Sequence, residues 1–224
     1  MNPRKLIRMI RAYRSGVALG DVVLLKLDAL SAPPRRTLER LERVRGYAPE
    51  HELTSLRALP AGTLGREYAR FLDANGIEPL VISAEMKARY HDAPYPLRFT
   101  TTHDLHHVLT GFDAGLAGEL GVAAFYVGQG SAPLGAAQLQ FVRALYSLLS
   151  PTQARTIWHN VRVGLELGRR AELVIAQPLE SWFAEPLAEV RARLRIPEPA
   201  SARVWPSGRS VFGEWIYPIK KKPA

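Results

Sequence analysis

The chain has 224 residues, of which 47% are hydrophobic, and a formal net charge of +9. This length and composition suit a single domain with a substantial core, or one domain with tails. The chain has no cysteine, which excludes disulfides, thiolate zinc sites and cysteine-ligated iron–sulfur clusters, and it has no apolar run long enough to predict a transmembrane helix.

The excess positive charge lies at the two ends of the sequence. Residues 1–26 contain six basic residues and one acidic residue, residues 201–224 contain five and one, and the charges of residues 27–200 cancel. Nucleic-acid-binding domains usually spread their basic residues over a folded face, so we expect no nucleic-acid partner. Basic ends on a neutral body favour an anionic membrane surface. No apolar signal core follows the N-terminal arginines, so we expect a cytoplasmic protein, peripheral on the inner face of the membrane.

Residues 1–24 are the first predicted element, a basic amphipathic segment. Its basic and its apolar residues both recur at helical spacing, the former being Arg4, Arg8, Arg11 and Arg14 and the latter Leu6, Met9, Ile10, Tyr13 and Val17. Such a helix lies in a membrane interface, or it docks on the protein with its basic face in water. The sequence leaves both interpretations open.

The helical period then continues to residue 196. After an apolar stretch over 17–30, we expect helices over residues 35–45, 64–75, 101–110, 116–127, 134–149, 151–176 and 186–195, and a short helix from Ser83 to Arg89. We expect loops over 47–62 and 128–133 and an irregular segment over 77–100, with Pro79, Pro94 and Pro96 as breakers. Only residues 211–219 have strand-like content. The sequence therefore predicts a single all-α domain, a helical bundle over residues 25–196, with a basic, less regular tail over 197–224.

The densest group of chemically active side chains is His103-Asp104-Leu105-His106-His107, which holds three of the six histidines. His103 and His107 are four residues apart, so on a helix they share one face. Asp104 lies three residues before His107 and leans toward the same face. Two imidazoles and a carboxylate form half of a coordination shell for a divalent cation. His106 points about 100° away from His107 and is not expected to be a ligand.

Glu119 completes the predicted shell if the chain turns back. Twelve residues of continuous helix would place it about 18 Å from His107. Gly111 can end the first helix in a left-handed cap, residues 112–115 form a turn, and Leu116 restarts a helix. The glycines and alanines of the returning helix suggest close approach of another backbone or of a ligand. We therefore expect His103, Asp104, His107 and Glu119 to hold a divalent metal, with zinc, iron(II) and manganese compatible with these ligands.

The remaining candidate residues carry weaker patterns. His159 lies in the middle of a helix and is interpreted as a core or surface residue. Arg98 could meet an anionic substrate, but a surface arginine is the expected role. Trp182 and Phe183 are expected to be packing anchors.

The metal motif, His-Asp-x-x-His followed after eleven residues by Glu, resembles the signature of the coenzyme Q (ubiquinone) biosynthesis protein 4 family. Residues 63–72, which end in a Tyr-x-x-Phe pattern, are similar to the upstream helix of that family. Its closing segment is matched by Trp182, Glu185, Leu187, Val190, Arg191, Leu194 and Ile196. The likeness covers residues 25–196. It departs at Thr101-Thr102, at residues 114–117 and at the extra His106, and these departures leave the four ligand positions intact.

The resemblance implies a metal-dependent lyase-type enzyme of ubiquinone synthesis. Its reaction would be an oxidative decarboxylation of a prenylated aromatic precursor, in which a hydroxyl takes the place of the carboxylate. The catalytic residues would be His103, Asp104, His107 and Glu119, with zinc as the first expectation for the metal. The implied partners are an isoprenoid-tailed quinone precursor, the anionic membrane surface, other ubiquinone-biosynthesis proteins and further copies of the chain. The alternative is a non-catalytic, lipid-binding organiser of the pathway, in which the metal is structural.

Two classes of hydrolase are weaker alternatives. A phosphohydrolase of the His-Asp doublet type needs a distant downstream aspartate, and no aspartate follows Asp113 in this chain. A zinc peptidase needs a glutamate base where Asp104 stands.

Overall fold

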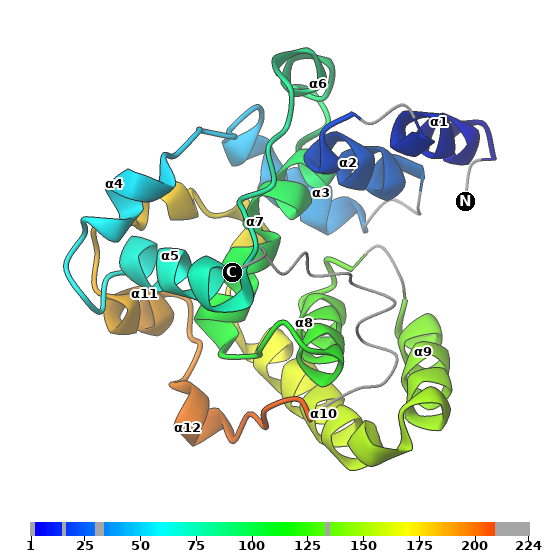
Figure 1. The fold of residues 1–224 in the computed structure, drawn as a ribbon, viewed down its shortest axis with the longest axis vertical. Helices are drawn as coiled ribbons and strands as arrows, with labels where there is room; N and C mark the ends of the chain where they lie inside the picture. The colour runs from blue at the N-terminus through cyan, green and yellow to red at the C-terminus, as the bar shows by residue number, and fades with distance from the viewer. Residues whose placement is uncertain (1–2, 15–16, 30–33, 133–134, 209–224) are drawn as a thin grey trace.

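The computed structural model describes residues 3–14, 17–29, 34–132 and 135–208, and these residues form an all-α fold (Figure 1). The predicted fold class is therefore confirmed. The only strand-like pairing within these ranges is an isolated bridge between Thr63 and Pro186. The predicted strand-like residues 211–219 lie outside the described residues.

Twelve α-helices and four short 3-10 helices make up the described chain. The α-helices are α1 (Pro3–Arg14), α2 (Leu19–Ala29), α3 (Arg35–Leu41), α4 (Leu53–Arg57), α5 (Leu64–Asn75), α6 (Ala84–Arg89), α7 (Pro94–Thr110), α8 (Leu116–Gly128), α9 (Ala136–Leu149), α10 (Ala154–Arg170), α11 (Leu187–Arg193) and α12 (Pro199–Ala202). The 3-10 helices are η1 (Glu42–Val44), η2 (Pro151–Gln153), η3 (Val174–Ala176) and η4 (Leu179–Trp182).

Local signals fix several of these helix ends. The Thr63 hydroxyl accepts a hydrogen bond from the backbone N–H of Arg66 at the start of α5, and Ser83 caps α6 in the same way through Met86. Gly76 ends α5 in the left-handed conformation, with φ of 63°. These ends agree with the helices that the sequence predicts.

Helix α7 begins seven residues before the predicted start at 101, so the expected irregular segment over 77–100 is wrong in its last part. Pro94 and Pro96 lie in the first turn, where a backbone N–H has no helical partner, so proline is tolerated there rather than acting as a breaker. The expected loop over 47–62 likewise contains the short helix α4, whose Leu56 is buried.

Helix α10 ends at Arg170, so the expected helix to residue 176 is too long. The four residues Leu173, Val174, Ile175 and Ala176 are all buried. A regular helix on the surface buries only one face, so four consecutive buried residues require the chain to leave α10 and enter the core.

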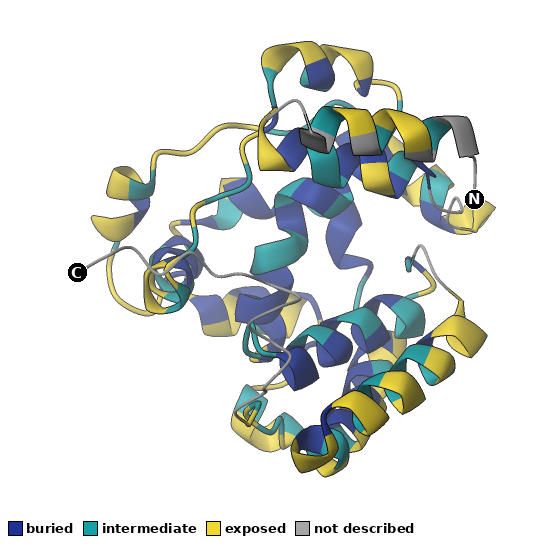
Figure 2. Ribbon diagram, turned by 45° about the vertical axis from the view of Figure 1, so that its right-hand side comes forward, coloured by how far each residue is buried: buried dark blue, intermediate teal, exposed yellow. Residues whose placement is uncertain are grey.

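Helix α7 runs through the middle of the molecule (Figure 1). It contacts α2, α3, α5, α8 and η3, and most of its residues are buried (Figure 2). It contributes to two core clusters, since Leu97 packs in the cluster around Leu24, whereas Tyr95 and Leu105 pack in the largest cluster. Polar residues on α7 are therefore held inside the protein rather than on its surface.

Glycines bring helices α8 and α10 into backbone contact. A Cβ atom on Gly164 would lie 2.2 Å from the carbonyl oxygen of Gly121, and one on Gly168 would lie 2.2 Å from that of Phe125. The close approach expected from the small residues of α8 is thus made by the backbone of α10.

The N-terminal helix α1 packs on α2. Met9 and Ala12 contact the cluster around Leu24, and Lys5 forms an ion pair with Asp28 at 2.7 Å. Arg8 and Arg11 are exposed. None of the described helices combines the length and the apolar character needed to cross a membrane.

Candidate metal centre

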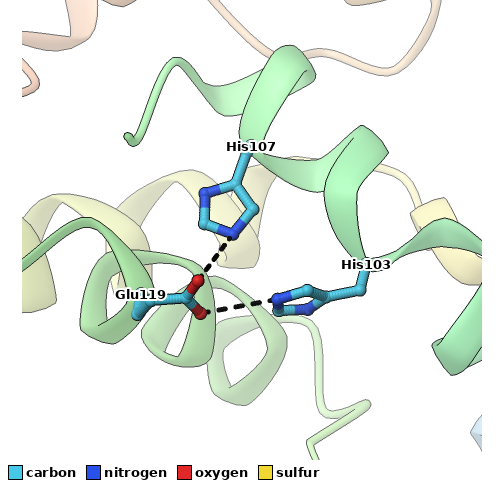
Figure 3. A group of neighbouring side chains, drawn as sticks. All are labelled: His103, His107 and Glu119. Atoms are coloured by element: carbon cyan, nitrogen blue, oxygen red, sulfur yellow. Dashed lines mark ion pairs between the residues drawn. The ribbon is translucent and has the colours of Figure 1, made fainter. Parts of the chain in front are cut away.

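Three of the four predicted ligands meet in the structure. His103, His107 and Glu119 each offer a ligand atom, and these atoms all lie within 4.8 Å of one another. The Nε2 atoms of His103 and His107 face the two carboxylate oxygens of Glu119 at 3.4 Å each (Figure 3). We call these three residues the metal group.

The turn between α7 and α8 brings Glu119 back to the histidines. Gly111 ends α7 with φ of 79°, and its N–H donates to the carbonyl oxygen of His107 at 2.8 Å. The Asp113 carboxylate accepts from the N–H of Gly115 at 3.0 Å and so holds the turn closed. Glu119 then lies in the first turn of α8, where the helix dipole stabilises a carboxylate.

A hydrogen bond from the ring fixes the tautomer of His107. Its Nδ1 lies 3.0 Å from the carbonyl oxygen of Phe112. A carbonyl oxygen only accepts, so Nδ1 carries the proton and Nε2 presents its lone pair toward Glu119. This is the arrangement of a metal-binding histidine whose second nitrogen is held by the backbone.

Within the metal group, the Glu119 carboxylate and the facing imidazoles shift each other's pKa. Burial lowers the pKa of His103, but the adjacent Glu119 carboxylate and the charge of Asp104 outweigh burial and raise the pKa above its usual range. Burial raises the pKa of Glu119, but the two facing imidazoles outweigh it and hold the pKa well below its usual range. Glu119 therefore stays ionised and stabilises positive charge at this position.

The donor set fits a divalent metal. His107 Nε2 is buried and has no hydrogen-bond partner in the described part of the chain. It is a lone pair aimed at a carboxylate, which is unfavourable unless a cation or a proton lies between them. Two imidazole nitrogens and a carboxylate suit zinc, iron(II) or manganese and leave coordination positions for other ligands.

Asp104, the fourth predicted ligand, is not a member of the metal group. It lies on the neighbouring face of α7 and lines a cavity there. Burial raises the pKa of its carboxyl group, although the charges of His103 and His107 act in the opposite direction. Asp104 is close enough to the metal group to interact with its charge, but its side chain faces a different space.

His106 is buried and contacts groups outside the metal group, consistent with its exclusion from the predicted ligands. Its Nδ1 lies 2.7 Å from the carbonyl oxygen of Thr102 and 3.0 Å from the hydroxyl of Tyr126. Burial lowers its pKa to about 3, so this histidine is neutral.

Aromatic rings whose contact with the site the sequence does not predict surround the two histidines. Phe71 stacks on His107 with ring centroids 5.2 Å apart, and Phe99 stacks on His103 at 6.3 Å. Phe99 precedes His103 by four residues, so helical spacing could have found it if the start of α7 had been predicted correctly. Phe71 comes from α5, and no local signal connects it to the motif.

Arg98 is completely buried, so its expected role as a surface arginine is wrong. Its guanidinium binds both carboxylate oxygens of Glu180, at 2.6 and 3.0 Å, and also donates to the carbonyl oxygens of Tyr47, Ile175 and Gln177. These contacts use its donors within the protein, so Arg98 does not meet an anionic substrate.

The other candidate residues are structural. His159 stacks on Trp205 with ring centroids 3.8 Å apart. Phe183 is buried in the largest core cluster, and Trp182 packs against that cluster, as expected for packing anchors.

Comparison with known proteins identifies relatives over most of the chain. The family model described as "Coenzyme Q (ubiquinone) biosynthesis protein Coq4" matches residues 31–200. The ubiquinone biosynthesis protein COQ4 homolog of Danio rerio, named as mitochondrial, is 32% identical over 189 residues, which are 82% of this chain and 68% of that protein. The Homo sapiens homolog, also named as mitochondrial, is 31% identical over 185 residues, 77% of this chain and 64% of that protein.

A solved structure shares the fold. It is a crystal structure titled as a putative ubiquinone biosynthesis protein from Nostoc punctiforme, with a TM-score of 0.59 and 25% identity, and the match covers 87% of this chain and 98% of that one. The family model spans the metal group and the helices that carry it. The chain therefore belongs to the Coq4 family of coenzyme Q (ubiquinone) biosynthesis proteins.

Proposed function

We propose that this protein is a metal-dependent enzyme that decarboxylates and hydroxylates a prenylated aromatic precursor of ubiquinone. In this proposal His103, His107 and Glu119 bind a divalent metal, and Asp104, whose side chain lines the neighbouring cavity, is a proton-transfer partner. The observation that carries the proposal is the metal group itself, with its ligand atoms within 4.8 Å and the tautomer of His107 set by a backbone carbonyl. Its three protein ligands leave coordination positions free, as catalytic sites do and closed structural sites do not.

The reaction removes the ring carboxylate as carbon dioxide and places a hydroxyl on the same carbon. It consumes dioxygen and two reducing equivalents from an external donor, and it releases water. A bound divalent metal supplies a Lewis acid for a substrate oxygen or for dioxygen. The three ligands would hold that metal from one side through α7 and α8. Phe71 stacks on His107, whose side chain is 1% exposed, whereas the His103 side chain is 28% exposed.

We also propose that the protein docks on an anionic membrane through helix α9, where its isoprenoid-tailed substrate resides. Phe141 and Leu148 on α9 are 69% and 80% exposed, and Trp158 on the adjoining α10 is 50% exposed. Figure 2 shows α9 as a largely exposed helix at the edge of the molecule. Residues 120–165, which include all of α9 and Trp158, contain three arginines and no acidic residue. Exposed aromatic and apolar residues beside arginines are typical of a surface that enters a membrane interface.

The metal assignment is tested by elemental analysis of the purified protein. We expect a stoichiometric divalent metal in the wild type at neutral pH. We expect His103→Ala and Glu119→Ala to lose both the metal and the ability to restore ubiquinone synthesis in a deficient strain, with unchanged circular dichroism. His159→Ala is the matched control and should retain both properties, because His159 lies outside the metal group. A wild type without stoichiometric metal would contradict the proposal.

The same complementation assay separates an enzyme from an organiser. A strain that carries Glu119→Ala should accumulate a carboxylated ring precursor, identified by mass. A general loss of all late intermediates, with no carboxylated precursor, would instead favour the non-catalytic organiser.

A further inference from the structure

A cavity of about 190 Å³ lies beside helix α7, on the face next to the metal group. Asp104 lines it, whereas His103, His107 and Glu119 do not. At about 100° per residue, Asp104 falls between the face of the two histidines and the face that Thr101 presents to the cavity. The cavity is thus a neighbouring space, separate from the metal group and bordered by a residue that interacts with it.

Asp104 is the acidic side chain of the cavity wall that has no ion-pair partner among the described residues. Glu180 is bound by Arg98, and Lys87 is bound by Glu50 at 2.5 Å. Within the described ranges, no hydrogen-bonding or ion-pair partner is found for the Asp104 carboxylate. A partly buried carboxylate without a protein partner favours a ligand that donates a hydrogen bond to it and disfavours an anion.

Tyr68 adds a second polar group to the same wall. Its side chain on α5 is 8% exposed, and its hydroxyl has no hydrogen-bond partner among the residues that the structure describes. Burial, together with the charges of Asp104 and Glu180, raises the pKa of Tyr68 far above its usual range, so the hydroxyl keeps its proton. Buried tyrosine hydroxyls usually find a partner, which here is left to a ligand or to water.

The rest of the wall suits a flat apolar body. It is formed largely by apolar side chains, among them Leu56, Leu80, Ile82, Leu105 and Phe183. An engineered cavity of about 150 Å³ in another protein holds benzene, so this volume accommodates a six-membered ring with a small substituent. The exposed residues Pro49 and Val81 belong to the rim, which gives the cavity access from solvent.

We propose that this cavity binds a neutral phenolic ring, whose hydroxyl donates a hydrogen bond to the Asp104 carboxylate and accepts one from the Tyr68 hydroxyl. The binding itself is independent of the metal. The proposal does not rest on the proposed function, whose reacting precursor carries a ring carboxylate. The cavity would hold the neutral ring beside the metal group through its hydroxyl.

The proposal is tested with ring compounds that lack a tail. 2-Methoxyphenol, 1,2-dimethoxybenzene and benzoate are titrated into the full chain by calorimetry. We expect 2-methoxyphenol to bind about tenfold or more tightly than the other two, because one lacks the donor and the other is an anion. Tyr68→Phe and Asp104→Asn should each weaken 2-methoxyphenol by about tenfold. Tyr146→Phe on α9 makes the same chemical change away from the cavity and should leave the affinity unchanged.

The metal is measured in the same samples. Tyr68→Phe should keep its metal, and His103→Ala should keep the affinity for 2-methoxyphenol even where it loses the metal. A wild type without metal would therefore overturn the proposed function alone. No saturable binding of 2-methoxyphenol, or equal affinity in the wild type and Tyr68→Phe, would overturn the cavity assignment alone.

Discussion

The buried pair of Arg98 and Glu180 fixes the segment after α10 to the central helix. The guanidinium of Arg98, on α7, reaches the carboxylate of Glu180 in η4 and the carbonyl oxygens of Ile175 and Gln177. Buried carbonyls need donors, and one guanidinium supplies them here. The pair therefore positions the segment that forms part of the wall of the cavity beside Asp104.

Removing one partner of this pair should lower the free energy of unfolding more than replacing both partners with apolar residues. We expect Glu180→Leu to lower the free energy of unfolding by about 3–5 kcal/mol, because it leaves a buried guanidinium unpaired. Arg98→Met combined with Glu180→Leu should recover part of this loss. Urea denaturation measures both. Arg40→Met is the control, since its ion pair with Glu172 is exposed and should contribute at most about 1 kcal/mol. Equal stabilities of Glu180→Leu and wild type would contradict this account.

The sequence predicts contacts between residues that are close in the chain, such as the metal ligands, but not the contact of Arg98 with a distant partner. His103, His107 and Glu119 lie within 17 consecutive residues, so helix periodicity and one glycine turn suffice to bring them together. Glu180 lies 82 residues from Arg98, and nothing in the local pattern identifies it as a partner. The contact of Phe71 with His107 is not predicted for the same reason, since it depends on the packing of α5 against α7.

At the scale of the elements, the sequence predicts a helix end correctly where the local residue type is compatible with only one position in a helix. Ser83 at the start of α6 and the left-handed Gly111 at the end of α7 predict helix ends correctly. Proline is ambiguous, because it ends a helix in the interior but is compatible with the first turn, and α7 uses Pro94 in the second way. The end of α10 has a tertiary cause, the burial of the four residues from Leu173 to Ala176, so periodicity alone extends this helix too far.

The glycine contact of α8 with α10 positions Glu119, so it should be sensitive to a single methyl group. We expect Gly164→Ala to destabilise the protein by about 1–3 kcal/mol, because the new Cβ would lie 2.2 Å from the Gly121 carbonyl oxygen and must force the helices apart. The displacement of α8 should also weaken metal retention. Thermal unfolding and metal analysis measure the two effects. Gly208→Ala is the control, since its Cβ would meet only the side chain of Gln153 at 3.5 Å.

At the scale of the whole molecule, α1 presents exposed arginines, and α9 with the adjoining α10 presents the largest exposed apolar side chains. The described arginines of α1 are exposed, while Met9 packs against the protein. The exposed apolar residues of α9 and α10 carry no neighbouring acidic residue in the sequence. Helix α1 would then bind the membrane through electrostatic attraction, whereas the exposed apolar side chains of α9 would insert into the membrane interface.

These two contributions can be separated by their salt dependence. We expect Phe141→Ser with Leu148→Ser to weaken binding to anionic liposomes by tenfold or more at any ionic strength, because burying each apolar side chain contributes about 1.5–3 kcal/mol. Deletion of residues 1–16 should weaken binding at low salt and have little effect at high salt, since screening removes the attraction of exposed charges. Ile7→Ser is the matched control for an exposed apolar residue, as its side chain is 51% exposed on α1. Unchanged liposome binding in the α9 variant, with full metal content, would exclude α9 as the docking surface.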